Sequence, residues 1–202
     1  MLTLPWFLGV TAGFAVLVAY GSVPGPSESP PDHWPATASI ERATDRPTLL
    51  VFVHPQCPCT LATIAELERL IAEVSGHVQP IVLLGCPANQ RQEWLETRLA
   101  QRCQMLSASQ VLADVNGVLA TQFNAMTSGF CVLYSATGKL QFHGGITYQR
   151  GHEGESHGRV ALRRILNGQP PLATKAPVYG CQLIRTENRP APPSPCCQEV
   201  EP

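Results

Sequence analysis

Charged side chains are scarce in this 202-residue chain, and their scarcity limits what the chain can bind. They make up 14% of the residues, against roughly 25% in an average soluble domain, and 14 basic side chains nearly balance 15 acidic ones. Lys139 and Lys175 are the only two lysines. Because no run of basic residues occurs, the sequence predicts neither a nucleic-acid partner nor a polybasic membrane patch.

Charge is absent altogether from residues 2–23, a stretch rich in Leu, Val, Ala, Phe and Gly. About 20 apolar residues can cross a bilayer as a helix. A secretory signal peptide normally opens with Lys or Arg, and none precedes this stretch. We therefore expect residues 1–23 to be an uncleaved transmembrane anchor, with a cleaved leader as the alternative. The first basic side chain beyond it is Arg42, so the positive-inside rule places the rest of the chain outside the cytoplasm.

Proline-rich segments flank the remaining sequence and set the expected domain boundaries. Residues 24–47 contain six prolines, which interrupt regular hydrogen bonding, and prolines recur near the C-terminus. These patterns predict a linker over 24–47, a folded domain over 48–185 and a flexible tail over 186–202.

Hydrophobic periodicity within the domain changes from element to element. A continuous apolar run predicts a buried strand over 48–53, and apolar residues three and four apart predict an amphipathic helix from Pro58 to Val74. A strand over 78–84 and a helix over 90–102 complete a strand-helix-strand-helix unit, which requires parallel strands. The later expected elements are a helical turn at 119–123, a hairpin of strands 130–134 and 140–143, and a helix over 156–167 that closes on Gly168.

The order of these elements, together with four motifs, resembles the thioredoxin-like superfamily and, within it, the membrane-tethered bacterial branch known as RedB-like. The motifs are FVHPQCPCT at 52–60, DVNGVLATQFNA at 114–125, TSGFCVLYSATGKLQFHGGIT at 127–147 and RGHEGESHGR at 150–159.

The resemblance implies an α/β fold with a mixed central sheet flanked by helices. It also implies thiol–disulfide exchange with protein substrates, and a domain that is held at the bacterial inner membrane and faces the periplasm. Two features depart from the family pattern. The usual C-x-x-C is Cys57-Pro58-Cys59, and Thr127-Ser128-Gly129 stands where a cis proline normally precedes the hairpin.

Cys57 and Cys59 are the predicted redox centre. Both lie where a strand gives way to a helix, and the N-terminus of a helix favours a thiolate. A disulfide within Cys-x-Cys would close a small ring, so we expect it to be strained and oxidising. His54 lies three residues before Cys57 and is a candidate catalytic cation or base, with an ordinary loop histidine as the alternative.

Other cysteines are candidates for the same site. Parallel strands end at one edge of a sheet, so Cys86 is a possible third thiol there or else a buried packing residue. Similar branch members carry Tyr/Phe-Gly-Cys near the position of Cys181, which makes Cys181 the candidate resolving thiol, with a structural cysteine as the alternative. Cys103 and Cys131 are expected to be packing residues, and the Cys196-Cys197 pair in the tail has no predicted geometry.

Two classes of function follow from these residues. The first is a membrane-anchored thiol–disulfide oxidoreductase that needs no cofactor. The alternative is a copper-binding or cofactor-maturation protein, in which Cys57, Cys59 and Cys86 supply the soft ligands that Cu(I) prefers. His152 and His157 are five residues apart, a spacing that does not favour a zinc site, so residues 151–158 are expected to form an ordinary loop.

Overall fold

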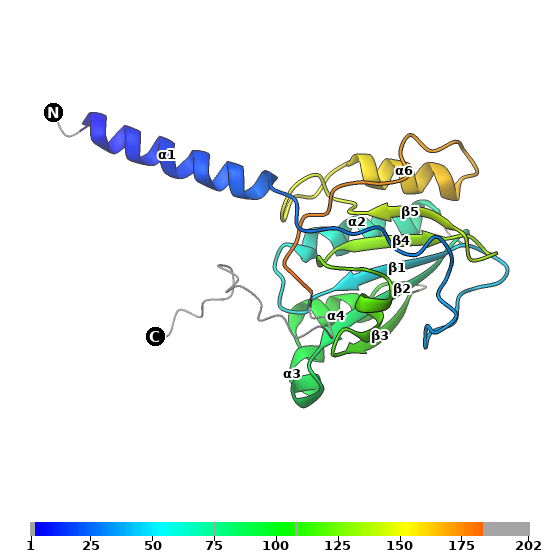
Figure 1. Ribbon diagram of the computed structural model, residues 1–202. Coiled ribbons are helices and arrows are strands. Elements are labelled where there is room, and N and C mark those ends of the chain that lie inside the picture. Colours follow the sequence, from blue (N-terminus) through cyan, green and yellow to red (C-terminus); the bar gives the residue numbers. More distant parts are fainter. Residues whose placement is uncertain (1–2, 75, 108, 184–202) are drawn as a thin grey trace.

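A five-stranded mixed sheet organises the domain in the computed structural model, which describes residues 3–74, 76–107 and 109–183 (Figure 1). The strands lie in the order β3-β2-β1-β4-β5. Strand β1 pairs in parallel with β2 and antiparallel with β4, while β2 and β3 are parallel and β4 and β5 are antiparallel. The strands are β1 (Thr48–Val53), β2 (Gln79–Cys86), β3 (Gln110–Val115), β4 (Phe130–Tyr134) and β5 (Leu140–Gly144).

The helices described are α1 (Thr3–Ser22), α2 (Thr60–Glu73), the 3-10 turn η1 (Ala88–Gln90), α3 (Arg91–Leu95), α4 (Arg98–Gln104), α5 (Val118–Gln122) and α6 (His157–Leu166). Helices α2 and α6 pack together on one face of the sheet (Figure 1). The arrangement is the thioredoxin-like mixed α/β fold that the order of motifs implied.

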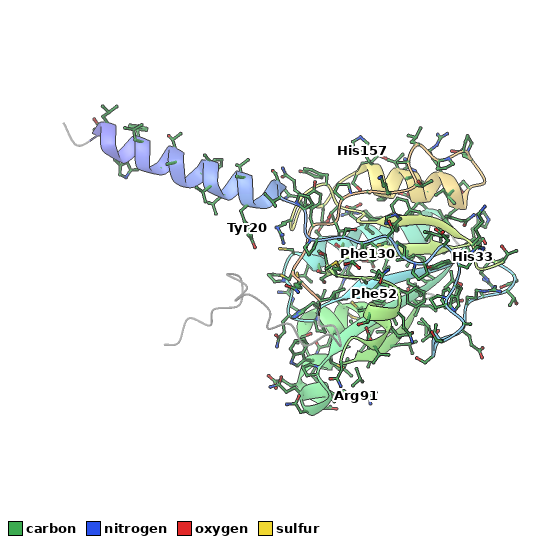
Figure 2. The ribbon with its side chains drawn as sticks, viewed as in Figure 1. Tyr20, His33, Phe52, Arg91, Phe130 and His157 are labelled. Atoms are coloured by element: carbon green, nitrogen blue, oxygen red, sulfur yellow. The ribbon has the colours of Figure 1, made fainter. Side chains whose placement is uncertain are left out.

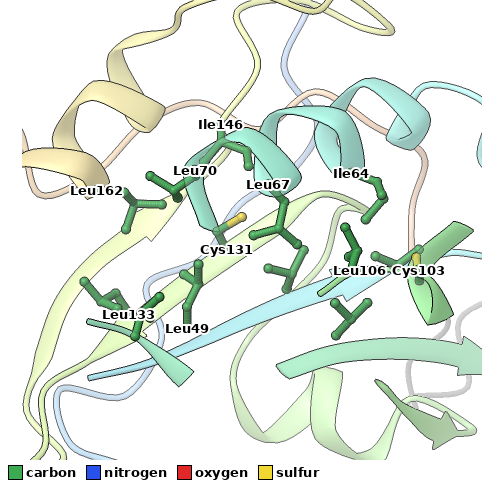
Figure 3. Packing of buried hydrophobic residues seen from close by; sticks show 14 of the residues in the cluster. Leu49, Ile64, Leu67, Leu70, Cys103, Leu106, Cys131, Leu133, Ile146 and Leu162 are labelled. Atoms are coloured by element: carbon green, nitrogen blue, oxygen red, sulfur yellow. The ribbon is translucent and has the colours of Figure 1, made fainter. Parts of the chain in front are cut away.

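Both faces of the sheet are covered, and β1 shows why its sequence is uniformly apolar. Side chains of a strand alternate between the two faces. Leu49, labelled in Figure 3, and Val51 therefore enter the core under α2 and α6. Leu50 and Phe52 enter the opposite core beside α5. Because each face has its own core, no position in β1 remains for a polar side chain facing water.

Most expected elements are present where the sequence predicted them. The strands at 48–53 and 130–134 match their predicted bounds, and Gly168 follows α6 with a left-handed φ of +69°. One element was missed, and one prediction was wrong. Strand β3 had no counterpart among the expected elements, and the helix expected over 90–102 is divided into α3 and α4 because the Thr97 side chain caps a new helix by accepting the Ala100 N–H.

Helix α1 projects away from the domain (Figure 1), and its apolar side chains, Phe14 and Leu17 among them, are exposed. Within the described part of the chain, no helix is long and apolar enough to cross a membrane. The predicted membrane-spanning helix is therefore not supported.

The proline-rich residues 24–47 lie along the domain. The Trp34 N–H donates to the Gly138 carbonyl at 2.8 Å, and the Tyr134 hydroxyl donates to the Pro31 carbonyl at 2.8 Å. The Trp34 ring also packs edge-on against Phe123 and Tyr134. Prolines thus prevent a regular ladder here without keeping the segment away from the core.

A buried carboxylate connects α2 to the loop before α6. Glu66 is fully buried and accepts hydrogen bonds from the Arg159 guanidinium at 2.9 Å and from the Gly154 N–H at 2.8 Å. Arg69 also pairs with Glu66. Ser156 accepts the Arg159 N–H and so caps α6. This network fixes the loop before α6 against the middle of α2.

Candidate functional site

Cys57 lies in the tight turn that connects β1 to α2. The Cys57 N–H donates to the His54 carbonyl at 2.9 Å, and the Thr60 N–H donates to the Cys57 carbonyl at 3.2 Å. Cys59 is the N-cap residue of α2. The predicted junction of strand and helix is therefore present, with Pro58 in the turn rather than inside either element. Cys57 is 1% exposed, whereas Cys59 is only partly buried.

Cys181 reaches the same place from the C-terminal part of the domain. Residues 126–128 and 181–183 run antiparallel: the Ser128 N–H donates to the Cys181 carbonyl, and the Leu183 N–H donates to the Met126 carbonyl, both at 2.8 Å. The Cys181 N–H donates to the Cys57 Sγ at 3.3 Å. The structure thus brings together two cysteines that are 124 residues apart in sequence.

The contacts of Cys57 favour its thiolate. Hydrogen bonds from the Cys181 and Cys59 side chains, and then from the Thr60 side chain and the Cys181 N–H, hold the pKa of Cys57 far below its ordinary value, against the opposing effect of burial. Hydrogen bonds to the Cys57 and Cys59 side chains raise the pKa of Cys181. The negative charge therefore resides on Cys57, while Cys181 keeps its proton and donates it.

Ser128 and Thr60 form a polar support under the thiol cluster. The Ser128 hydroxyl accepts the His54 backbone N–H at 2.8 Å, and it lies 2.7 Å from the Thr60 hydroxyl. Both residues are buried. Ser128 stands in the segment that replaces the usual proline, and within the described residues no peptide bond is cis. The hydroxyl network thus joins the turn of Cys57 to the segment that holds Cys181.

His54 lies beside the cluster with its ring already engaged. Its Nδ1 accepts the Gln56 N–H at 3.2 Å, and its ring packs on Trp94 with centroids 4.9 Å apart. Burial lowers the pKa of His54, and the nearby Cys57 charge offsets this only in part. The lowered pKa favours the neutral imidazole, whose Nδ1 orients the turn by accepting this hydrogen bond, and a catalytic role for His54 stays a prediction.

Cys86 does not join the three thiols. It is buried at the end of β2, where burial raises its pKa and its charged neighbours are Arg91 and Asp114. In the described ranges, no group of three or more His, Cys, Asp or Glu side chains is placed to hold a metal ion. Cys57, Cys59 and Cys86 are not among such groups in those ranges, and copper binding by these three residues stays a prediction.

Two of the remaining cysteines are packing residues, as the sequence predicted. Cys103 and Cys131 are fully buried in the core under α2 (Figure 3), and burial raises the pKa of each thiol to about 12. Such thiols are poor nucleophiles. Cys196 and Cys197 lie outside the described residues.

Sequence reasoning missed Thr60, Ser128 and Arg150 as parts of the site. The Arg150 guanidinium donates to the Gly180 carbonyl, next to Cys181. A Cβ added to the adjoining Gly151 would lie 3.9 Å from the Cys59 Cα, which places this loop against the cysteine turn. For Ser128 the sequence offered one signal, a polar segment in place of the usual proline.

Comparisons with known proteins identify the fold. The chain matches no family model and no curated protein. A hypothetical protein from Sinorhizobium meliloti has a similar structure, with a TM-score of 0.61 and 18% identity over 79% of this chain and 97% of the other. An uncharacterized conserved protein from Geobacillus kaustophilus gives a TM-score of 0.58 at 18% identity, over 84% and 95% of the two chains.

A thiol-disulfide oxidoreductase from Bacteroides fragilis is a more distant match, with a TM-score of 0.40 and 22% identity over 60% of this chain and 89% of that one. At 18% identity, the likeness to the proteins from Sinorhizobium meliloti and Geobacillus kaustophilus concerns the fold alone. The chemistry of this chain must therefore be argued from its own cysteines.

Proposed function

We propose that this protein is a thiol–disulfide oxidoreductase in which Cys57, Cys59 and Cys181 are the redox-active thiols. The observation that carries the proposal is the Cys57 Sγ, which accepts the Cys181 N–H at 3.3 Å while three side chains lower its pKa. A thiolate is the reactive form of cysteine in disulfide exchange. Cys181, whose backbone N–H makes this contact and whose side chain also lowers the pKa of Cys57, is the partner that such exchange needs.

The proposed cycle has two displacements. In the first, the Cys57 thiolate attacks one sulfur of a substrate disulfide, forming a mixed disulfide and releasing the other sulfur as a thiolate. In the second, Cys181 loses its proton and attacks the Cys57 Sγ, which releases the second substrate sulfur. The substrate gains two electrons, and the protein keeps a Cys57–Cys181 disulfide. Cys59, the most accessible of the three, is the alternative resolving thiol.

A turnover assay with a disulfide-bonded protein such as insulin, and dithiothreitol as reductant, tests this proposal. We expect Cys57→Ser to abolish turnover. Incubated with insulin in the absence of dithiothreitol, Cys181→Ser should retain the first attack and accumulate a mixed disulfide, because its resolving thiol is missing. Cys103→Ser is the matched control and should behave like the wild type, since that thiol is buried in the core. Full turnover by the Cys57→Ser variant would contradict the proposal.

Membership in the RedB-like branch and a location in the periplasm belong to the same proposal. The motifs around Cys57 and the uncharged residues 2–23 support them, and disulfide chemistry is typical of compartments outside the cytoplasm. A reporter enzyme fused to the C-terminus, of a kind active only outside the cytoplasm, tests the location. Activity of the fusion supports it, and an inactive but well-expressed fusion overturns it.

A further inference from the structure

The segment that carries Cys181 covers the site. Residues 177–183, termed the strap below, are held by the antiparallel contacts with 126–128 and by the Gly25 N–H, which donates to the Val178 carbonyl at 2.8 Å. With the strap in place Cys57 is 1% exposed. The strap therefore delivers the resolving thiol and also shields the nucleophile.

One cationic side chain reaches the strap next to Cys181. The Arg150 Nη1 donates to the Gly180 carbonyl, and its guanidinium carbon lies 5.1 Å from the centroid of the Tyr20 ring. Figure 2 shows Tyr20 at the end of α1 that adjoins the domain. The Arg150 N–H donates to the Gly21 carbonyl at 3.1 Å, which fixes the backbone of Arg150 as well. Arg150 thus lies between the end of α1 and the strap.

The hydrogen bond from Arg150 to the Gly180 carbonyl bears on the position of Cys181. The Gly180 carbonyl immediately precedes the Cys181 N–H, because the two belong to the same peptide group. A donor on this carbonyl fixes the plane of that peptide, and the N–H at its other end is the one that donates to the Cys57 Sγ. A hydrogen bond from a charged donor is about twice as strong as a neutral one.

We propose that Arg150 is a positioning residue, which holds the 180–181 peptide so that Cys181 stays against Cys57. This inference rests on the proposed function, because it concerns the same pair of thiols. Arg150 then has two effects. It shields Cys57 from reagents in solution, and it raises the effective concentration of Cys181 at the Cys57 Sγ.

The second effect is measurable with glutathione. The Cys57 thiolate attacks glutathione disulfide, forms a mixed disulfide and releases one glutathione thiolate. Cys181 then loses its proton, attacks the Cys57 Sγ and displaces the second glutathione, which takes up that proton. Two electrons pass from the protein thiols to glutathione. A Cys181 that is held less firmly closes the disulfide less favourably, so a more oxidising glutathione ratio is needed.

The test uses the full-length chain in a Cys59→Ser background, so that Cys57 and Cys181 are the only cluster thiols. Arg150→Met keeps an apolar stem and removes the donor, while Arg150→Lys keeps a cationic donor without the planar guanidinium. Arg164→Met is the matched control, because Arg164 also donates to a backbone carbonyl, that of Pro170 at 2.9 Å, away from the cluster.

Two readouts are compared in variants whose circular dichroism shows a folded domain. The first is the iodoacetamide alkylation rate of Cys57, mapped by mass spectrometry, and the second is the glutathione ratio that half-forms the Cys57–Cys181 disulfide. For Arg150→Met we expect about tenfold faster alkylation and about a tenfold more oxidising ratio, as loss of one charged hydrogen bond implies. Arg150→Lys should lie between this variant and the wild type.

Equal values in Arg150→Met and Arg164→Met, in both readouts, would overturn the positioning role. The alkylation rate decides the matter even if no Cys57–Cys181 disulfide forms in the parent protein, an outcome that would count against the proposed function instead. If Arg150→Met does not fold, Arg150→Lys decides: alkylation of Cys57 at the control rate overturns the proposal, and a faster rate supports it.

Discussion

Replacing Gly180 by alanine should lift the strap from Cys57 without touching a thiol. A Cβ at Gly180 would lie 2.0 Å from the Ser128 carbonyl oxygen, which belongs to the backbone and cannot rotate away. To restore an ordinary contact, the strap would have to move by at least about 1 Å. Such a shift stretches the two hydrogen bonds on either side of the Cys181 backbone.

The loss of docking free energy of the strap can be worked out from those two hydrogen bonds. The Ser128 N–H to Cys181 carbonyl bond measures 2.8 Å, and the Cys181 N–H to Cys57 Sγ contact measures 3.3 Å. At about 1 kcal/mol of net stabilisation each, their loss weakens docking of the strap by about 2 kcal/mol, which is roughly a 30-fold increase in molecules with Cys57 exposed. Val178 and Leu183 of the strap belong to the core beside α5, so the unfolding temperature should fall as well.

The assay is the alkylation rate of Cys57 in the reduced, full-length Cys59→Ser protein. Gly13→Ala is the matched control, since a Cβ at Gly13 meets no atom within 4 Å. We expect Gly180→Ala to raise the rate by about one to one and a half orders of magnitude over this control. Equal rates in the two variants, with both proteins folded, would refute the reasoning that the strap shields the thiolate.

Three further outcomes follow from buried charges and from the pKa of the nucleophile. Glu66→Ala should destabilise the domain by about 3 kcal/mol in urea unfolding, because it leaves the nearly buried Arg159 without its 2.9 Å partner. An unchanged midpoint of unfolding would show that Glu73 alone is a sufficient partner for Arg159. Asp114→Ala should cost about 1 kcal/mol, since the Asp114 carboxylate accepts two N–H groups at the start of α5, at 2.8 and 2.9 Å, and Asp114→Asn should recover part of that loss. Because the pKa of Cys57 lies far below that of a free cysteine, its thiolate is already formed at neutral pH. The alkylation rate of Cys57 should therefore be nearly constant from about pH 6 to about pH 8. The alkylation rate of a free thiol rises about tenfold per pH unit over that range.

Strands buried on both faces were the most predictable part of the fold. The short apolar run over 48–53 favours a strand because buried helices are usually longer, and the strand has those bounds. Strand β3 was missed because it lies at the sheet edge, where Gln110 is exposed and Asp114 turns inward to cap α5, so its residues show neither a continuous apolar run nor strict alternation.

The cysteine turn was predictable from local sequence, and the surroundings of the turn were not. Cys57 and Cys59 follow directly from a strand running into a helix start. Cys181 was reached through a family resemblance, because no periodicity connects residues 124 positions apart. Ser128 and Arg150 depend on how loops from distant parts of the chain meet, which hydrophobic patterns do not encode.

The pairing of thiols in the wild-type chain tests the central claim most directly. The full-length protein, equilibrated in glutathione buffers of increasing oxidising strength and mapped by mass spectrometry, should form a Cys57–Cys181 disulfide, while Cys103 and Cys131 stay reduced in the core. A protein in which Cys57 remains a free thiol across the whole series, or pairs with neither Cys181 nor Cys59, would contradict the account.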